Sequence, residues 1–123
     1  MLGSHKLVAF VLTTDPARAR KFYGETLGLR FVMEDGFAVV FDDNGTTLRA
    51  GIVKELQPAK HTVLGWEVPD ITAAVQQLSG AGVQFNHYGL PNQDDLGIWS
   101  APGGAKVAWF QDPDGNVLSV SQM

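Results

Sequence analysis

An internal repeat constrains the fold of this chain more than any other feature of its sequence. Asp15 and Asp70 each follow an apolar run and stand where a side chain can cap the first turn of a helix. Apolar residues then recur at the spacing of an amphipathic helix. Each helix is expected to end at a glycine, Gly28 or Gly82, and to be followed by a strand. The same order of signals occurs twice, which predicts two copies of one structural unit.

The hairpin turns repeat as well. Asn-Gly at 44–45 and Asp-Gly at 114–115 each stand between two strand-like segments, and both dipeptides are strong hairpin signals. Further turns are predicted at 34–36 and 102–104, where glycines lie beside acidic residues or proline. Each half therefore reads as a strand, a helix and three antiparallel strands.

These halves, about 5–53 and 61–122, are two βαβββ modules of an α+β protein. A unit of roughly 50–60 residues makes a poor core by itself. We therefore expect residues 1–123 to form a single domain in which the two modules share a core.

Composition excludes several classes of function. The chain has 9 Lys and Arg against 13 Asp and Glu, so it lacks the basic face of a nucleic-acid-binding protein. It has no cysteine and therefore no disulfide or thiolate metal site. No apolar run approaches the ~20 residues of a membrane span, and Met1–Lys6 does not resemble a signal peptide. A soluble cytoplasmic protein is expected. Gly3-Ser4-His5 resembles a cloning remnant, so we assign His5 no role.

Paired βαβββ modules with an Asp-Pro-Asp-Gly hairpin before the last strand resemble the vicinal oxygen chelate superfamily. This group includes glyoxalase I, extradiol dioxygenases, fosfomycin-resistance enzymes and bleomycin-binding resistance proteins. The resemblance covers nearly the whole chain and is most specific over 108–119, with support from 15–29. It implies the glyoxalase/bleomycin resistance/dihydroxybiphenyl dioxygenase fold, in which the modules form a concave half-barrel cup with helices on the convex side. It also implies a homodimer.

Metal enzymes of that superfamily take mainly His and Glu ligands from the opening and closing strands of each module. The matching positions here hold Val8, Arg49, Val63 and Ser119. Valine and arginine cannot ligate a divalent ion, and one serine cannot hold it alone. A shift of one residue brings no His or Glu to these positions. We therefore predict no metal ligands and no cofactor.

The resemblance and its missing ligands favour a metal-free small-molecule binder, similar to antibiotic-sequestering members of the superfamily. One alternative is an enzyme of the lyase, isomerase or dioxygenase type, using non-standard metal ligands or metal-free acid and base residues. Another is a scaffold whose cup is filled by its own side chains, Val8, Phe10 and Val63. The sequence does not identify the ligand, and it leaves open whether the protein is an enzyme.

Alternation along the strands assigns side chains to two faces. Those expected beneath the helices are Leu7, Ala9, Val11, Leu48, Ala50, Ile52, Leu64, Trp66, Val68, Leu118 and Val120. Those expected to face the cup are Val8, Phe10, Leu12, Arg49, Gly51, Val53, His61, Val63, Gly65, Glu67, Val117, Ser119 and Ser121. The second set is mostly apolar with a few polar groups, as small-molecule pockets are.

Arg49 and Glu67 are the charged candidates. In an apolar cup, the Arg49 guanidinium can clamp a carboxylate, phosphate or enolate, which predicts an anionic ligand. The alternatives are an ion pair with Glu67 and a side chain whose charged head reaches solvent at the rim of the cup. Glu67 is a candidate general base if it is desolvated, and otherwise a paired or solvated charge.

Two histidines and two tryptophans complete the candidate set. His61 and Glu67 are about 20 Å apart along a strand, too far to share a metal. His87, expected on the strand after the second helix, is a candidate acid or base, or a structural histidine. Trp99 and Trp109, expected on the third and fourth strands of the second module, can stack a planar ligand, pack in the core or contact a second subunit. The loop at 90–96 is a candidate lid, with Asp94 and Asp95 at a solvated tip.

Overall fold

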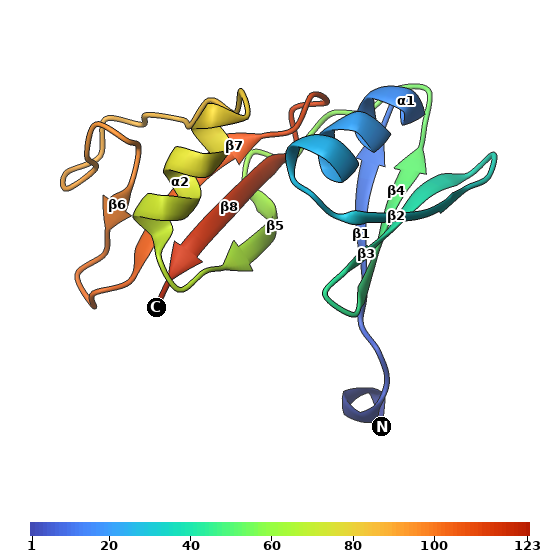
Figure 1. The fold of residues 1–123 in the computed structure, drawn as a ribbon, viewed down its shortest axis with the longest axis horizontal. Coiled ribbons are helices and arrows are strands. Elements are labelled where there is room, and N and C mark those ends of the chain that lie inside the picture. Colours follow the sequence, from blue (N-terminus) through green and yellow to red (C-terminus); the bar gives the residue numbers. More distant parts are fainter. The chain divides into compact units, whose positions relative to one another are not determined.

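Each predicted module forms its own mixed four-stranded sheet in the computed structural model, which describes residues 1–123 (Figure 1). The chain divides into two compact units, 1–57 and 58–123, here called module one and module two. The strand order is β1-β4-β3-β2 in module one and β5-β8-β7-β6 in module two. In each, the first and last strands of the module lie side by side in parallel, and the remaining pairs are antiparallel. The predicted βαβββ order is confirmed twice.

Module one contains β1 (Val8–Thr13), α1 (Pro16–Ala19), the π-helical segment η2 (Arg20–Thr26), β2 (Arg30–Glu34), β3 (Ala38–Asp43) and β4 (Thr46–Ile52). A short 3-10 turn, η1 (Leu2–Ser4), precedes them. The helix that the sequence predicts as one element thus widens after its first turn, and the Leu27 N–H donates to the Phe22 carbonyl at 2.9 Å.

Module two contains β5 (Thr62–Glu67), α2 (Ile71–Gly80), β6 (Trp99–Ser100), β7 (Lys106–Gln111) and β8 (Val117–Gln122). Trp99 and Trp109 therefore lie on the second and third strands of this module, and their assignment to the third and fourth strands was wrong. The reason is that residues 83–98 form almost no regular strand. Two isolated bridges pair Phe85 with Phe110 and Gln93 with Trp99.

The predicted helix caps are present. A carboxylate oxygen of Asp15 accepts from the Arg18 N–H, and one of Asp70 accepts from the Ala73 N–H, both at 3.1 Å. The Gln122 side chain also accepts from the Ile71 N–H at 2.9 Å, which ties the first turn of α2 to the last strand. These bonds satisfy donors that a helix start otherwise leaves unpaired.

The core of each module lies between its sheet and its helix. In module two α2 packs against β7 and β8, and the buried sheet residues alternate along these strands: Ala108, Phe110, Leu118 and Val120. In module one the corresponding set is Val11, Leu48, Ala50, Val39 and Phe41, covered by Ala19 and Tyr23. Among the residues that alternation assigned to the helix side, Val11, Leu48, Ala50, Leu118 and Val120 are confirmed as buried.

Several residues assigned to the helix side are less buried than expected, since Ala9, Ile52, Leu64 and Val68 are only half-buried. Leu7 is 74% exposed, because β1 begins at Val8 and Leu7 has no partner on β4. Trp66 lies in register with buried Val120 but is itself only half-buried. The reason is that β5 is an edge strand of its sheet, and α2 covers β7 and β8 instead.

None of the helices has the length and apolar character that crossing a membrane would take.

Candidate functional site

The faces of the two sheets that the helices leave uncovered carry the candidate ligand-binding residues. We call them the open faces. In module one, Val8, Phe10 and Leu12 of β1 all point away from the buried side and are exposed. In module two, Trp109 and Ser119 lie between buried neighbours on β7 and β8, so they too point to the open face.

Arg49 lies at the centre of the open face of module one. It is directly opposite Phe10 on β1 and Val40 on β3, and Val40 pairs in turn with Met33 on β2. A single row across all four strands is therefore Met33, Val40, Arg49 and Phe10. Three of these four side chains are apolar, so the guanidinium of Arg49 stands in an apolar row.

The acidic group that interacts with Arg49 in module one is Asp35, in the turn between β2 and β3. The N–H groups of Phe37 and Ala38 donate to the Asp35 carboxylate at 2.8 and 3.0 Å. These bonds are the main reason that the pKa of Asp35 lies below its ordinary value, and the positive charge of Arg49 lowers the pKa further. The predicted alternative partner, Glu67, belongs to the other module, so its pairing with Arg49 stays a prediction.

Three aromatic rings gather on the open face of module two. The Trp99 and Trp109 ring centroids are 6.0 Å apart at an interplanar angle of 35°. Tyr88 joins them edge-on, with its centroid 5.6 Å from that of Trp109. We call Tyr88, Trp99 and Trp109 the aromatic cluster. The sequence predicted the two tryptophans as a wall for a planar ligand, but it did not identify Tyr88.

Ser119 extends the aromatic cluster toward β5. It lies between Trp109 on β7 and Gly65 on β5. A Cβ atom placed on Gly65 would be only 2.6 Å from the Ser119 Oγ, so the missing side chain at residue 65 makes room for the hydroxyl. Trp109, Ser119 and Gly65 therefore form one row, and the small residues leave the indole without a bulky neighbour on that side.

The segment after α2 is held by one side chain in addition to its isolated bridges to β7 and β6. The Gln93 Oε1 accepts from the Tyr88 N–H at 2.9 Å, and the Gln93 Nε2 donates to the carbonyls of Asn86 and Gly97 at 3.0 and 3.1 Å. These bonds replace those that a partner strand would supply. Placing His87 on a strand was therefore wrong: it lies exposed in this irregular segment.

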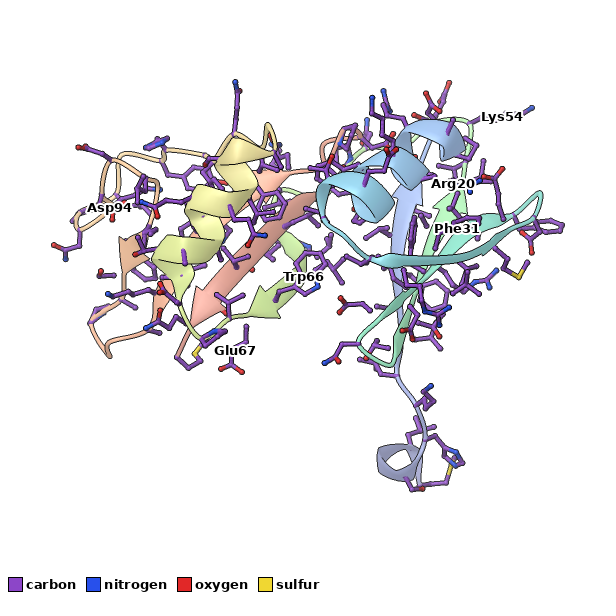
Figure 2. All side chains as sticks on the ribbon, in the orientation of Figure 1. Arg20, Phe31, Lys54, Trp66, Glu67 and Asp94 are labelled. Atoms are coloured by element: carbon purple, nitrogen blue, oxygen red, sulfur yellow. The ribbon has the colours of Figure 1, made fainter.

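Within the loop predicted as a lid, the side chain of Asp94, which Figure 2 labels, holds a turn together. One Asp94 carboxylate oxygen accepts from the N–H groups of Leu96 and Ile98, both at 2.9 Å. Asp112 binds the N–H groups of Asp114 and Asn116 in the same way, at 3.0 and 2.9 Å. Both turns have the pattern Asp-x-x-Gly-x, so the exposed Asp94 has a structural part and is more than a solvated tip.

Glu67 and His61 lie at opposite ends of β5. Glu67 is exposed at the last residue of the strand (Figure 2). Its cross-strand row continues through Ser121 and Val107 to Trp99 on β6, so Glu67 and Trp99 stand on the two edge strands of the sheet. His61 precedes the other end of β5, and its Nδ1 is 3.1 Å from the Thr62 carbonyl oxygen. The structure brings Trp99, Trp109 and Ser119 together, and in module one it brings Phe10 and Arg49 together.

No group of three His, Asp or Glu side chains in the structure is arranged to hold a metal ion. Val8 and Arg49 lie on neighbouring strands of module one, and Val63 and Ser119 on the equivalent strands of module two. A donor set of two valines, an arginine and a serine does not fit a divalent ion.

The family comparison places nearly the whole chain within one family. The profile of the Glyoxalase/Bleomycin resistance protein/Dioxygenase superfamily matches residues 6–120. A search of curated proteins finds no match.

Several solved structures share the fold at low sequence identity. A member of the same superfamily from Sphaerobacter thermophilus DSM 20745 is 22% identical, with a TM-score of 0.76 and full coverage of both chains. TnmS3, an antibiotic binding protein from Streptomyces sp. CB03234, is 24% identical, with a TM-score of 0.74 over 99% of this chain and 98% of its own. Lactoylglutathione lyase from Agrobacterium tumefaciens is 16% identical, with a TM-score of 0.73 over 97% and 93%.

Proposed function

We propose that this chain, which belongs to the Glyoxalase/Bleomycin resistance protein/Dioxygenase superfamily, binds a small organic molecule without a metal ion. The observation that carries the proposal is the aromatic cluster on the open face of module two. The ring centroid of Trp109 lies 6.0 Å from that of Trp99 and 5.6 Å from that of Tyr88. Aromatic walls with a few polar groups are the usual lining of a small-molecule site. The Ser119 hydroxyl beside Trp109 is such a group.

The side chains at the superfamily's metal-ligand positions support ligand binding rather than metal-assisted catalysis. In module one a guanidinium occupies a position where metal enzymes of the superfamily hold a ligand, and an arginine both fails to ligate a cation and repels it. The Arg49 fork of N–H donors suits a carboxylate or phosphate oxygen instead. Arg49 therefore favours an anionic ligand at the open face of module one.

An antibiotic is one candidate class of ligand. TnmS3, which shares the fold, is described as an antibiotic binding protein. This description supports including antibiotics among the molecules to test.

A thermal-shift screen over antibiotics and small aromatic and aliphatic oxoacids tests the proposal. A ligand that binds the native state raises the unfolding midpoint, by an amount that grows with its concentration. We expect a midpoint shift with a planar acid that is lost in Trp109→Ala and kept in Trp66→Phe, since Trp66 is on the opposite face of the same sheet. No shift with any planar acid, or catalytic turnover that requires an added metal, contradicts the proposal.

We further propose that the chain is a single domain and a homodimer. The large apolar side chains of module one support association, since Phe10 and Phe37 are 65% and 79% exposed. Exposed apolar patches commonly mark interaction surfaces. Light scattering during gel filtration should give twice the chain mass, and one cooperative unfolding transition should be seen. A monomer at micromolar concentration contradicts the dimer, and two separate transitions contradict the single domain.

A further inference from the structure

A hollow opens on module two beside the aromatic cluster. Its volume is about 600 Å³, and Tyr88 is one of its walls. Gln111, two residues beyond Trp109 on β7, lines it as well. The Tyr88 ring thus faces the hollow and also contacts the Trp109 ring. The hollow and the aromatic cluster are therefore neighbouring parts of one surface.

Lys60 is the charged residue that lines the hollow, and no acidic residue lines it. His87 also lines it, but His87 lines a second hollow together with Asp95, so we do not count it among the donors. The Asn86 Nδ2 donates to the Tyr88 hydroxyl oxygen at 3.0 Å, which leaves the hydroxyl proton to donate to another acceptor. Lys60 and the Tyr88 hydroxyl therefore offer donors to an incoming oxygen atom.

The segment that carries Lys60 is held against the last hairpin. A Cβ atom on Gly115 would lie 3.1 Å from the Pro58 Cγ, so the proline ring packs directly over this glycine. Gly115 also has a φ of +90°, which favours a glycine at this place. The packing of Pro58 fixes the start of the segment and sets Lys60 at the rim of the hollow.

We propose that this hollow takes the carboxylate of an aromatic acid whose ring lies against Trp99 and Trp109. This inference rests on the proposed function, because it assumes that the aromatic cluster binds the planar part of the ligand. The distance of 5.6 Å between the Tyr88 and Trp109 rings is short enough for one bicyclic acid to touch both the cluster and the hollow. A charged oxygen placed there forms charge-assisted hydrogen bonds.

Two probes separate the ring from the charge: naphthalene-2-carboxylate and its neutral counterpart naphthalene-2-carboxamide. The chain has 3 tryptophans, so the indole N–H resonances in a ¹H–¹⁵N spectrum, assigned by Trp→Phe variants, report where each probe binds. We expect both probes to move the Trp99 and Trp109 resonances and to leave Trp66 unchanged. We expect the carboxylate to bind about threefold to fivefold more tightly than the amide, as an exposed charge pair would give.

Lys60→Met should remove most of this difference without changing the affinity for the amide. Lys54→Met is the matched control, because Lys54 is an exposed lysine of module one (Figure 2). Circular dichroism spectra of all variants should match that of the parent.

The outcomes distinguish this inference from the proposed function. If neither probe moves the Trp99 and Trp109 resonances, both fail. If both probes move them but Lys60→Met leaves the carboxylate preference intact, the inference fails and the proposed function stands. Loss of the preference in Arg49→Met but not in Lys60→Met would place the carboxylate at Arg49 and likewise overturn the inference.

Discussion

The Ser119 Oγ occupies the space that a side chain at residue 65 would need: a Cβ on Gly65 would approach it to 2.6 Å. The equivalent pair in module one, Phe10 and Arg49, holds two large side chains at the same register. The repeat therefore places bulk and charge at a position in one module where the other has a glycine and a serine. The open surface beside Trp109 depends on this difference.

Gly65→Ala should lower the free energy of unfolding by about 1 kcal/mol, at the low end for an overpacked site because the serine hydroxyl can rotate away. In a Ser119→Ala background the same replacement should be neutral or slightly stabilising, because alanine reduces the freedom of the unfolded chain. Urea unfolding of the four proteins measures this coupling. Equal costs in both backgrounds would show that the serine hydroxyl is not the obstacle.

Asp112→Ala and Asp94→Ala remove the same two hydrogen bonds from turns of one pattern, but they should differ in cost. Asp112 is 5% exposed, and its second oxygen also accepts from the Asn116 Nδ2 at 2.8 Å. Its loss leaves buried donors unpaired and should cost about 2–4 kcal/mol. Water can replace the exposed Asp94, whose loss should cost about 0.5–1.5 kcal/mol. Equal costs measured by denaturant unfolding would contradict the argument from burial.

Trp66→Ala should cost about 1–3 kcal/mol, because the indole is half-buried at an edge strand. Full burial under the second helix, as the alternation pattern predicted, would have given ~3–5 kcal/mol. Phe110→Ala is the matched control on the same face: its ring is 1% exposed beneath α2 and should cost ~3–5 kcal/mol. A Trp66→Ala cost equal to that of Phe110→Ala would mean that the indole is fully covered in solution.

Asp35 should make the free energy of unfolding depend on pH in the acidic range. Hydrogen bonds from the Phe37 and Ala38 N–H groups, with a smaller contribution from Arg49, hold its pKa below the ordinary 3.8. A depressed carboxyl pKa stabilises the fold above the unfolded-state value and loses this contribution as the pH falls through the folded-state value. Asp35→Asn should therefore be less stable than the parent near neutral pH. The difference between their free energies of unfolding should shrink as the pH falls from about 5 to about 2.

An NMR titration of the Asp35 carboxyl carbon tests the cause directly. Arg49→Met should raise the pKa of Asp35, whereas Arg30→Met should leave it unchanged, since the Arg30 guanidinium lies 3.7 Å from Asp42. An unchanged pKa of Asp35 in Arg49→Met would remove Arg49 as a contributor.

Purified, untagged protein should hold no stoichiometric divalent metal after dialysis. The reason is the donor set at the superfamily's ligand positions, in which Val8 and Val63 offer no lone pair and Arg49 carries a positive charge. Elemental analysis measures this directly. Near-stoichiometric zinc, nickel, manganese or iron, lost on chelation together with an activity, would establish a metal enzyme instead.

The regular parts of the fold could be predicted because their signals are local. Asp15 and Asp70 cap their helices as expected, and the Asn-Gly and Asp-Gly turns connect the expected strands. Alternation placed Phe10 and Arg49 on one face of their sheet and Leu48 and Ala50 on the other, because strand side chains point to opposite faces in turn.

The rest depended on contacts that no periodicity reveals. Gln93 replaces a strand by bonding Asn86, Tyr88 and Gly97, and a lone glutamine in a polar loop gives no signal for this. Tyr88 joins the aromatic cluster only because of that local arrangement. Trp66 has the apolar character of a core residue, but the extent of its burial depends on how far α2 reaches across the sheet.

The hydrogen bonds of the Gln93 side chain also indicate where the sequence of this protein tolerates change. The Asn86 N–H donates to the Trp109 carbonyl oxygen of β7, but beyond Asn86 the backbone of the segment is bonded by the side chains of Gln93 and Asp94 and by its own turns. Substitutions beyond Asn86 therefore need not disturb the pairing of β7 with β8. Tyr88 and His87, which line the hollow, both belong to this stretch. Changes in this loop can thus alter the lining of the hollow while β7 and β8 keep their register.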